Sequence, residues 1–113
     1  MQDLAPAIHR QRLVIEGIPN RSITDVDIVE YLKLLTKVLE MTPLMTPVAH
    51  RSPAYGWAGW THWETSGAHF YAWDTPTLFF SVDVYTCKPF HDAEAVTFTK
   101  GYFGAETIVH KGF

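Results

Sequence analysis

Hydrophobic residues recur at helical spacing in one segment of the N-terminal half of the chain. The apolar stripe repeats every three or four residues, through Ile28, Leu32, Leu35 and Leu39. Thr24 stands just before this stripe, where a hydroxyl is a typical N-cap. The pattern predicts an amphipathic helix over residues 24–40, ended by Met41-Thr-Pro43 because proline cannot continue the hydrogen bonding.

The rest of the chain is rich in β-branched and aromatic segments that alternate with turn residues, which predicts strands. The expected strands are residues 12–18, 46–50, 57–64, 67–73, 78–86 and 105–110, with a loop at 51–56. A second, short helix is expected over 92–102, capped by Asp92. This order predicts an α/β (α+β) two-layer sandwich, a mostly antiparallel sheet with two helices on one face. A length of 113 residues fits one domain over 1–113.

Composition and charge narrow the class of protein. The hydrophobic share of 47% and the charged share of 19% are those of ordinary globular domains. A net charge of -3 without a basic run argues against a nucleic-acid surface, and no apolar stretch is long enough for a membrane span. The N-terminus lacks the basic and apolar regions of a signal peptide, and a single cysteine forms no intramolecular disulfide, so a cytoplasmic location is expected.

Several residue types have both an ordinary and a functional interpretation. All four tryptophans lie between Trp57 and Trp73, which indicates a core, a dimer interface or a ring-binding pocket. The six histidines show no metal-ligand spacing, so no metal site is expected. Ser66 before Gly67 is typical of a turn, and a lone Cys87 is most often a small buried core residue.

Three short strings, in their order and spacing, resemble bacterial-type S-adenosylmethionine decarboxylase proenzymes. They are Gly56-Trp-Ala-Gly59, Val82-Asp-Val-Tyr-Thr-Cys87 and Phe103-Gly-Ala105. The resemblance extends over nearly the whole chain and implies the two-layer fold described above. It also implies a lyase of polyamine (spermidine) biosynthesis, a homodimer, and binding of S-adenosylmethionine or a related small molecule. The family makes its own pyruvoyl cofactor from an internal serine, and this group serves as the electron sink for loss of carbon dioxide.

Carried over residue by residue, the resemblance assigns Ser66 as the pyruvoyl precursor and Cys87 as the acid that protonates the product. The family has a glutamate immediately before this serine, where the chain has Thr65, with Glu64 displaced by one position. A shifted register, with Thr65 as the nucleophile, is a second alternative.

Two other positions depart from the family. Its processing serine corresponds to Ala58, and its processing histidine to Tyr71. His69 lies two residues before Tyr71, on the same face of the strand. The candidate catalytic set is therefore Ser66, Cys87, His69 and Tyr71.

These departures leave two hypotheses from different classes. The first is a pyruvoyl-dependent decarboxylase, acting on S-adenosylmethionine or another amino acid, that is impaired in self-maturation. The second is a non-catalytic paralogue that binds a small molecule or acts as a regulatory partner subunit, without a cofactor.

Overall fold

The computed structural model describes residues 1–113 and contains six strands and two helices. The helices and strands, in chain order, are β1 (Gln11–Ile18), α1 (Asp25–Val38), β2 (Val48–Ser52), β3 (Gly56–Trp63), β4 (Ser66–Trp73), β5 (Phe79–Thr86), α2 (Asp92–Phe103) and β6 (Thr107–Gly112). Each expected element is present, with its ends shifted by at most a few residues. Residues 1–10 precede the first strand and belong to no helix or strand.

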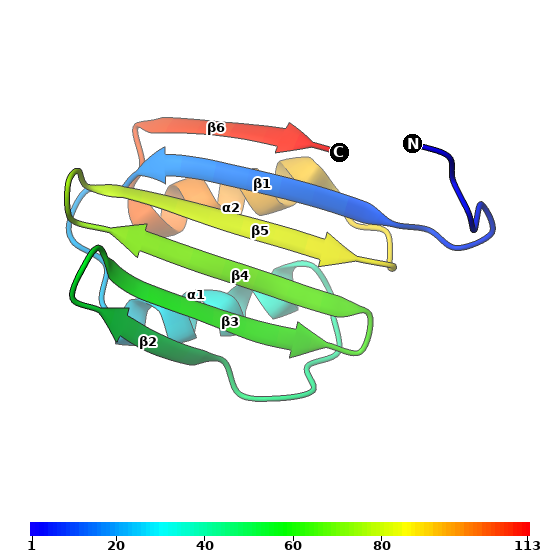
Figure 1. Cartoon of the computed structure of the whole chain (residues 1–113), viewed down its shortest axis with the longest axis horizontal. Helices are drawn as coiled ribbons and strands as arrows, with labels where there is room; N and C mark the ends of the chain where they lie inside the picture. Colours follow the sequence, from blue (N-terminus) through cyan, green and yellow to red (C-terminus); the bar gives the residue numbers. More distant parts are fainter.

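The strands form one sheet in the order β2-β3-β4-β5-β1-β6, and every neighbouring pair is antiparallel. Both helices lie behind the same face of this sheet, so the other face is left open (Figure 1). The predicted two-layer α/β sandwich is therefore confirmed. The long hairpin β3–β4 and the strand β5 run side by side, which brings the turn after Trp63 next to the end of β5.

The core lies between the helices and the sheet and contains 19 buried hydrophobic residues. Strand alternation sends every second side chain of β1, β4 and β5 into this layer. Two buried polar contacts cross it. The Tyr31 hydroxyl lies 2.7 Å from the Thr99 hydroxyl and joins α1 to α2, and the indole N–H of Trp63 donates to the Thr36 hydroxyl at 2.8 Å, joining β3 to α1.

The structure corrects the expected end of the first helix. α1 ends at Val38, before Pro43 is reached, because Glu40 adopts a left-handed conformation with φ 56°. The N–H of Met41 then donates to the carbonyl of Thr36 at 2.9 Å, which closes the helix. Its start is as predicted, because Thr24 and Asp27 form a reciprocal capping box.

Two other local expectations are wrong. The N-cap of α2 is His91, and Asp92 is the first helical residue, whose carboxylate accepts a hydrogen bond from the Gln11 side chain at 2.9 Å. The segment 51–56, expected as a loop, contributes Arg51 and Ser52 to β2, which pairs with β3.

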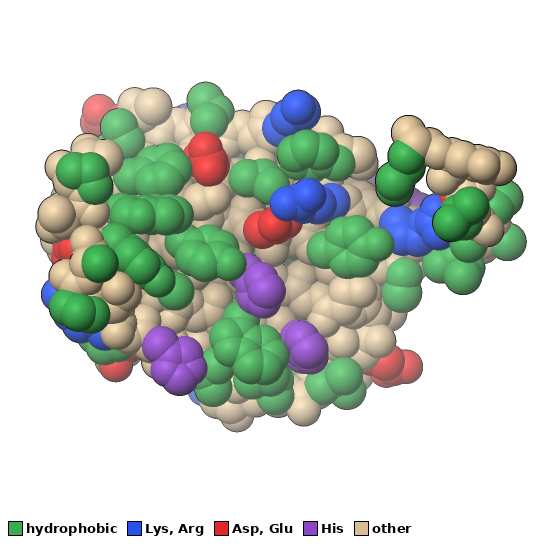
Figure 2. Space-filling view, in the orientation of Figure 1, with side chains coloured by type: hydrophobic (Ala, Val, Ile, Leu, Met, Phe, Trp, Pro, Cys, Tyr) green, Lys and Arg blue, Asp and Glu red, His purple; other side chains and the backbone are tan.

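Strand alternation divides the tryptophans between the two faces of the sheet. Trp63 is buried against α1, and Trp57 packs partly on the core. Trp60 and Trp73 alternate onto the open face, where Trp60 lies beside His62 and His69 with ring centroids 4.8 and 6.4 Å away. Figure 2 shows hydrophobic side chains and histidines gathered over this face. Neither helix is long and apolar enough to cross a membrane.

Candidate functional site

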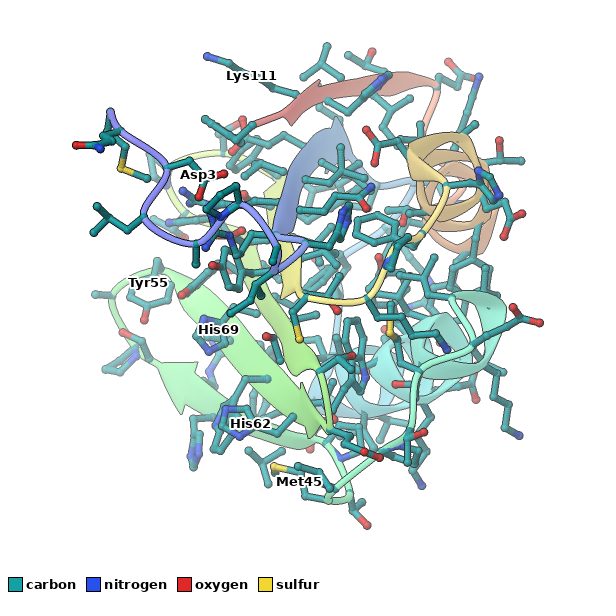
Figure 3. The ribbon with its side chains drawn as sticks, turned by 90° about the vertical axis from the view of Figure 1, so that its right-hand side faces the viewer. Asp3, Met45, Tyr55, His62, His69 and Lys111 are labelled. Carbon is teal, nitrogen blue, oxygen red and sulfur yellow. The ribbon has the colours of Figure 1, made fainter.

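A pocket of about 600 Å³ lies at the end of the sheet where the β3–β4 turn meets the end of β5. Ser66, Cys87 and His69 all line it, so the structure brings together three of the four residues that the sequence nominated. His62 and His69 lie on the side of the sheet away from the helices (Figure 3), and both line the pocket. Cys87 is exposed, which rules out the buried core role that is common for a lone cysteine.

Ser66 has an unusual backbone conformation. The hairpin turns through Glu64 and Thr65, and Ser66 then pairs with Trp63 on one side and Thr86 on the other. Its φ of 129° lies in a region that residues with a side chain rarely adopt. Such a conformation costs about 1–3 kcal/mol and persists only where the surroundings enforce it. The strain is therefore located at the candidate serine itself.

The carbonyl group before Ser66 is held by the end of β5. The main-chain N–H of Cys87 donates to the carbonyl oxygen of Thr65 at 2.9 Å. A donor on this oxygen polarises the carbonyl and stabilises negative charge that develops on it when a nucleophile attacks the carbon. The hydroxyl of Thr65 donates a hydrogen bond to the sulfur of Met41, 3.4 Å away.

Gly67 lines the pocket directly after Ser66 and has no room for a side chain. A Cβ at this position would lie 2.3 Å from the carbonyl oxygen of Thr61, a separation that no real Cβ tolerates. Only glycine therefore fits between Ser66 and the neighbouring strand.

One wall of the pocket carries a paired charge. The Nε and Nη2 atoms of Arg12 donate to the two carboxylate oxygens of Asp83, at 3.0 and 2.8 Å. These hydrogen bonds raise the pKa of Arg12, so the guanidinium keeps its charge. Tyr85 and Glu64 complete the polar lining. The pocket thus combines an ion pair, carboxylate and aromatic groups around the serine.

Ala58 and Tyr71 lie outside this pocket. They are cross-strand partners in the β3–β4 ladder, on the open face of the sheet. Tyr71 is five residues beyond Ser66 on β4, which is roughly 17 Å along an extended strand. The ring of His69 is 6.4 Å from that of Tyr71, toward Ser66. The structure therefore places Ala58 and Tyr71 together but away from the serine of the same chain.

Sequence reasoning missed the residues that support the site. Arg12, Asp83, Thr86, Met41 and Gly67 meet around the hairpin only because β1, β5 and the α1–β2 connection converge there. No local motif identifies these residues, although the sequence does show Gly67 directly after the serine. No group of three histidine, cysteine, aspartate or glutamate side chains lies close enough together to hold a metal ion.

The fold and the site define a two-layer sandwich whose strained serine sits on a hairpin beside an exposed cysteine. A family model described as S-adenosylmethionine decarboxylase matches residues 14–112, and the chain belongs to this family. The resemblance seen in the sequence is thereby confirmed. A search of the curated proteins gives no match to the chain.

A solved structure agrees with this assignment at the level of the fold. The chain is similar to the crystal structure of the adenosylmethionine decarboxylase from Aquifex aeolicus VF5, with a TM-score of 0.77 and 17% sequence identity. The similarity covers 94% of this chain and 89% of that one.

Proposed function

We propose that the chain is an S-adenosylmethionine decarboxylase-like proenzyme of polyamine (spermidine) biosynthesis whose self-maturation at Ser66 is impaired. The observation that carries this proposal is the pairing of a left-handed Ser66 with a preceding carbonyl that accepts the Cys87 N–H at 2.9 Å. A cytoplasmic location also remains a prediction.

The chemistry follows from the bonds at this peptide. Attack of the Ser66 hydroxyl on the Thr65 carbonyl carbon forms a C–O bond and breaks the C–N bond, so the amide becomes an ester. The Cys87 N–H stabilises the oxyanion during this step. The ester then requires a base to remove the α-proton of Ser66 and expel the Thr65 carboxylate. This elimination leaves dehydroalanine at position 66. Its hydrolysis, with loss of ammonia, gives the pyruvoyl group.

Impaired maturation is supported by the groups that surround the serine. The alanine methyl at position 58 and the phenol at position 71 replace a hydroxyl and an imidazole that the family uses for processing. A phenol has an ordinary pKa near 10, so it is a poor base at neutral pH. Within one chain these positions are also roughly 17 Å from Ser66.

A homodimer is therefore part of the proposal. The open face presents Trp60, Trp73 and the 36%-exposed Tyr71, an apolar surface that a second copy can bury. In such a pair, position 71 can reach Ser66 only from the partner.

The residues present fit a pyruvoyl group at position 66. Its carbonyl groups would lie at the pocket beside Cys87, whose exposed thiol can supply a proton to the product. When formed, the group would supply the electron sink for decarboxylation. The ligand would be S-adenosylmethionine or another amino acid, held between the carboxylates of Glu64 and Asp83 and the ring of Tyr85.

The intact mass of the purified protein tests the proposal. We expect one chain of about 12.9 kDa, with fragments split before Ser66 appearing slowly on incubation. The matched control is Ser66→Ala, which should give no fragments at all. Complete and rapid cleavage of the wild type would overturn the impairment.

The second candidate is a non-catalytic paralogue that binds a small molecule or partners an active homologue. The observation that favours it is the Ala58–Tyr71 pair. With these two residues the pocket is kept intact, but the side chains that the family uses for processing are absent. Binding of S-adenosylmethionine without any cleavage, even in a variant with Ala58→Ser and Tyr71→His, would support this alternative.

A further inference from the structure

Thr86, the last residue of β5, is fully buried and pairs with Ser66 in the β4–β5 ladder. Its hydroxyl oxygen accepts a hydrogen bond from the N–H of Lys88 at 3.0 Å. The same hydroxyl lies 3.1 Å from the hydroxyl oxygen of Thr65. This buried hydroxyl therefore joins Thr65, directly before the candidate serine, to Lys88, directly after Cys87.

The direction of these hydrogen bonds follows from counting protons. Each threonine hydroxyl has one proton to donate. The Thr65 hydroxyl donates to the sulfur of Met41 at 3.4 Å, whereas the Thr86 hydroxyl is 3.9 Å from that sulfur. Thr86 therefore donates to Thr65 while it accepts from Lys88. The result is a continuous relay from Lys88 through both hydroxyls to Met41, and bonds in such a chain strengthen one another.

Thr65 is consequently held at two points by the end of β5. Its carbonyl accepts the N–H of Cys87, and its hydroxyl accepts the proton of Thr86. Two contacts on one residue restrict rotation of the peptide that leads into Ser66. We infer that Thr86 is a positioning residue for self-processing, acting through the Thr65 hydroxyl to orient the carbonyl that Ser66 attacks. Its role in processing rests on the function proposed above.

This assignment gives the threonine at position 65 a structural role in the site. The hydroxyl turns inward to Met41 and Thr86 and takes part in holding the peptide. A glutamate at this position cannot form the same two contacts, because its carboxylate is larger and carries no proton to donate at neutral pH. Thr65→Glu therefore removes the contacts that the Thr65 hydroxyl forms with Met41 and Thr86.

The single cysteine of the chain provides a direct measurement of the held carbonyl. Protein labelled with [15N]cysteine gives one backbone amide signal, that of Cys87, whose hydrogen exchange reports its bond to Thr65. Four variants are compared with the wild type: Thr86→Val, Thr65→Val, their combination, and Thr86→Ser. Thr61→Val is the matched control, since Thr61 is also buried, on a strand of the same sheet, and its hydroxyl has no partner.

Loss of one hydrogen bond of ordinary strength should accelerate Cys87 exchange by about tenfold in Thr86→Val and in Thr65→Val. The double variant should exchange no more than about twofold faster than either single variant, because both break the same relay. Thr86→Ser and Thr61→Val should stay within about twofold of the wild type. An unchanged rate in Thr65→Val, or effects that multiply in the double variant, would overturn the inference.

Processing supplies the second readout. In a chain with Ala58→Ser and Tyr71→His, adding Thr86→Val should lower the cleaved fraction, and adding Thr86→Ser should preserve it. A parent variant that never cleaves would count against the proposed function, whereas the exchange pattern alone decides how Thr86 holds the peptide.

Discussion

Ala58 and Tyr71 face each other across the β3–β4 ladder, on the open face of the sheet. The sequence resemblance assigns these two positions to the family's processing serine and histidine. The two departures are therefore one structural change, made in one place on the open face of the sheet. The same face is the one that a second copy would cover. Maturation and assembly are thus linked in the proposals made for this protein, and each can be tested by substitution.

Restoring the pair together should restore processing. The variant with Ala58→Ser and Tyr71→His regains a hydroxyl and a base with a pKa near neutrality, and cleavage before Ser66 should accelerate by about a hundredfold. Intact mass over time measures the rate. Adding Thr65→Glu should slow this variant again, because it breaks the contact with Thr86. An unaltered single chain in the restored variant would mean that Ser66 is not the processed residue.

Relief of backbone strain at Ser66 should be measurable. Ser66→Gly and Ser66→Ala both remove the hydroxyl, but only glycine adopts a φ of 129° without strain. The glycine variant should be more stable than the alanine variant by about 1 kcal/mol in urea unfolding. Equal stability of the two variants would show that position 66 is unstrained.

Acid should weaken the start of α1 through Asp27. Hydrogen bonds, first from Arg21 and then from Thr24, lower the pKa of Asp27 from 3.8 to about 2. A carboxylate with a depressed pKa stabilises the fold above pH 4, and this contribution is lost as the pH falls toward 2. Asp27→Asn should remove about 1–2 kcal/mol at pH 7 and flatten the dependence between pH 4 and 2.

Asp25→Asn is the control for that substitution. Asp25 is exposed in the same helical turn and forms none of the capping contacts. Its substitution should cost much less stability at pH 7 than Asp27→Asn, because no capping hydrogen bond is lost. Equal losses in the two variants would assign the effect to the helix dipole alone.

A charge on the open face should prevent assembly. Tyr71→Glu places a carboxylate among the apolar groups of that face. Light scattering should show the mass of one chain, 12.9 kDa, for this variant and twice that value for the wild type. Val26→Glu is the control, because Val26 is 69% exposed on α1, at the opposite layer. A monomeric wild type would refute the dimer.

The contact between Trp63 and Thr36 should contribute to stability. Thr36→Val leaves a buried indole N–H without an acceptor, at a cost of about 1–3 kcal/mol in the free energy of unfolding. Thr61→Val removes a buried hydroxyl that has no partner, so it should be neutral or stabilising. Equal losses in the two variants would contradict the role assigned to the hydrogen bond.

Local periodicity was sufficient to predict the elements but not their ends. The stripe of Ile28 to Leu39 specifies α1 because a helix must bury one face, and alternation in β3 to β5 specifies strands for the same reason. Pro43 was expected to end α1, yet the chain turns earlier, at Glu40, where Met41 enters the core beneath the hairpin. Packing of Met41 is a long-range contact, and no local pattern encodes it.

The family could also be predicted from the linear chain, and the resemblance that carries it nominates Ser66 and Cys87 as candidate site residues. The groups that surround Ser66 could not be predicted from the linear chain. The left-handed backbone, the Cys87 N–H on the Thr65 carbonyl and the Thr86 hydroxyl come from separate strands, and their meeting depends on the register of β4 against β5. A one-residue change of that register would turn every side chain to the opposite face, so only the folded sheet places these groups around one peptide bond.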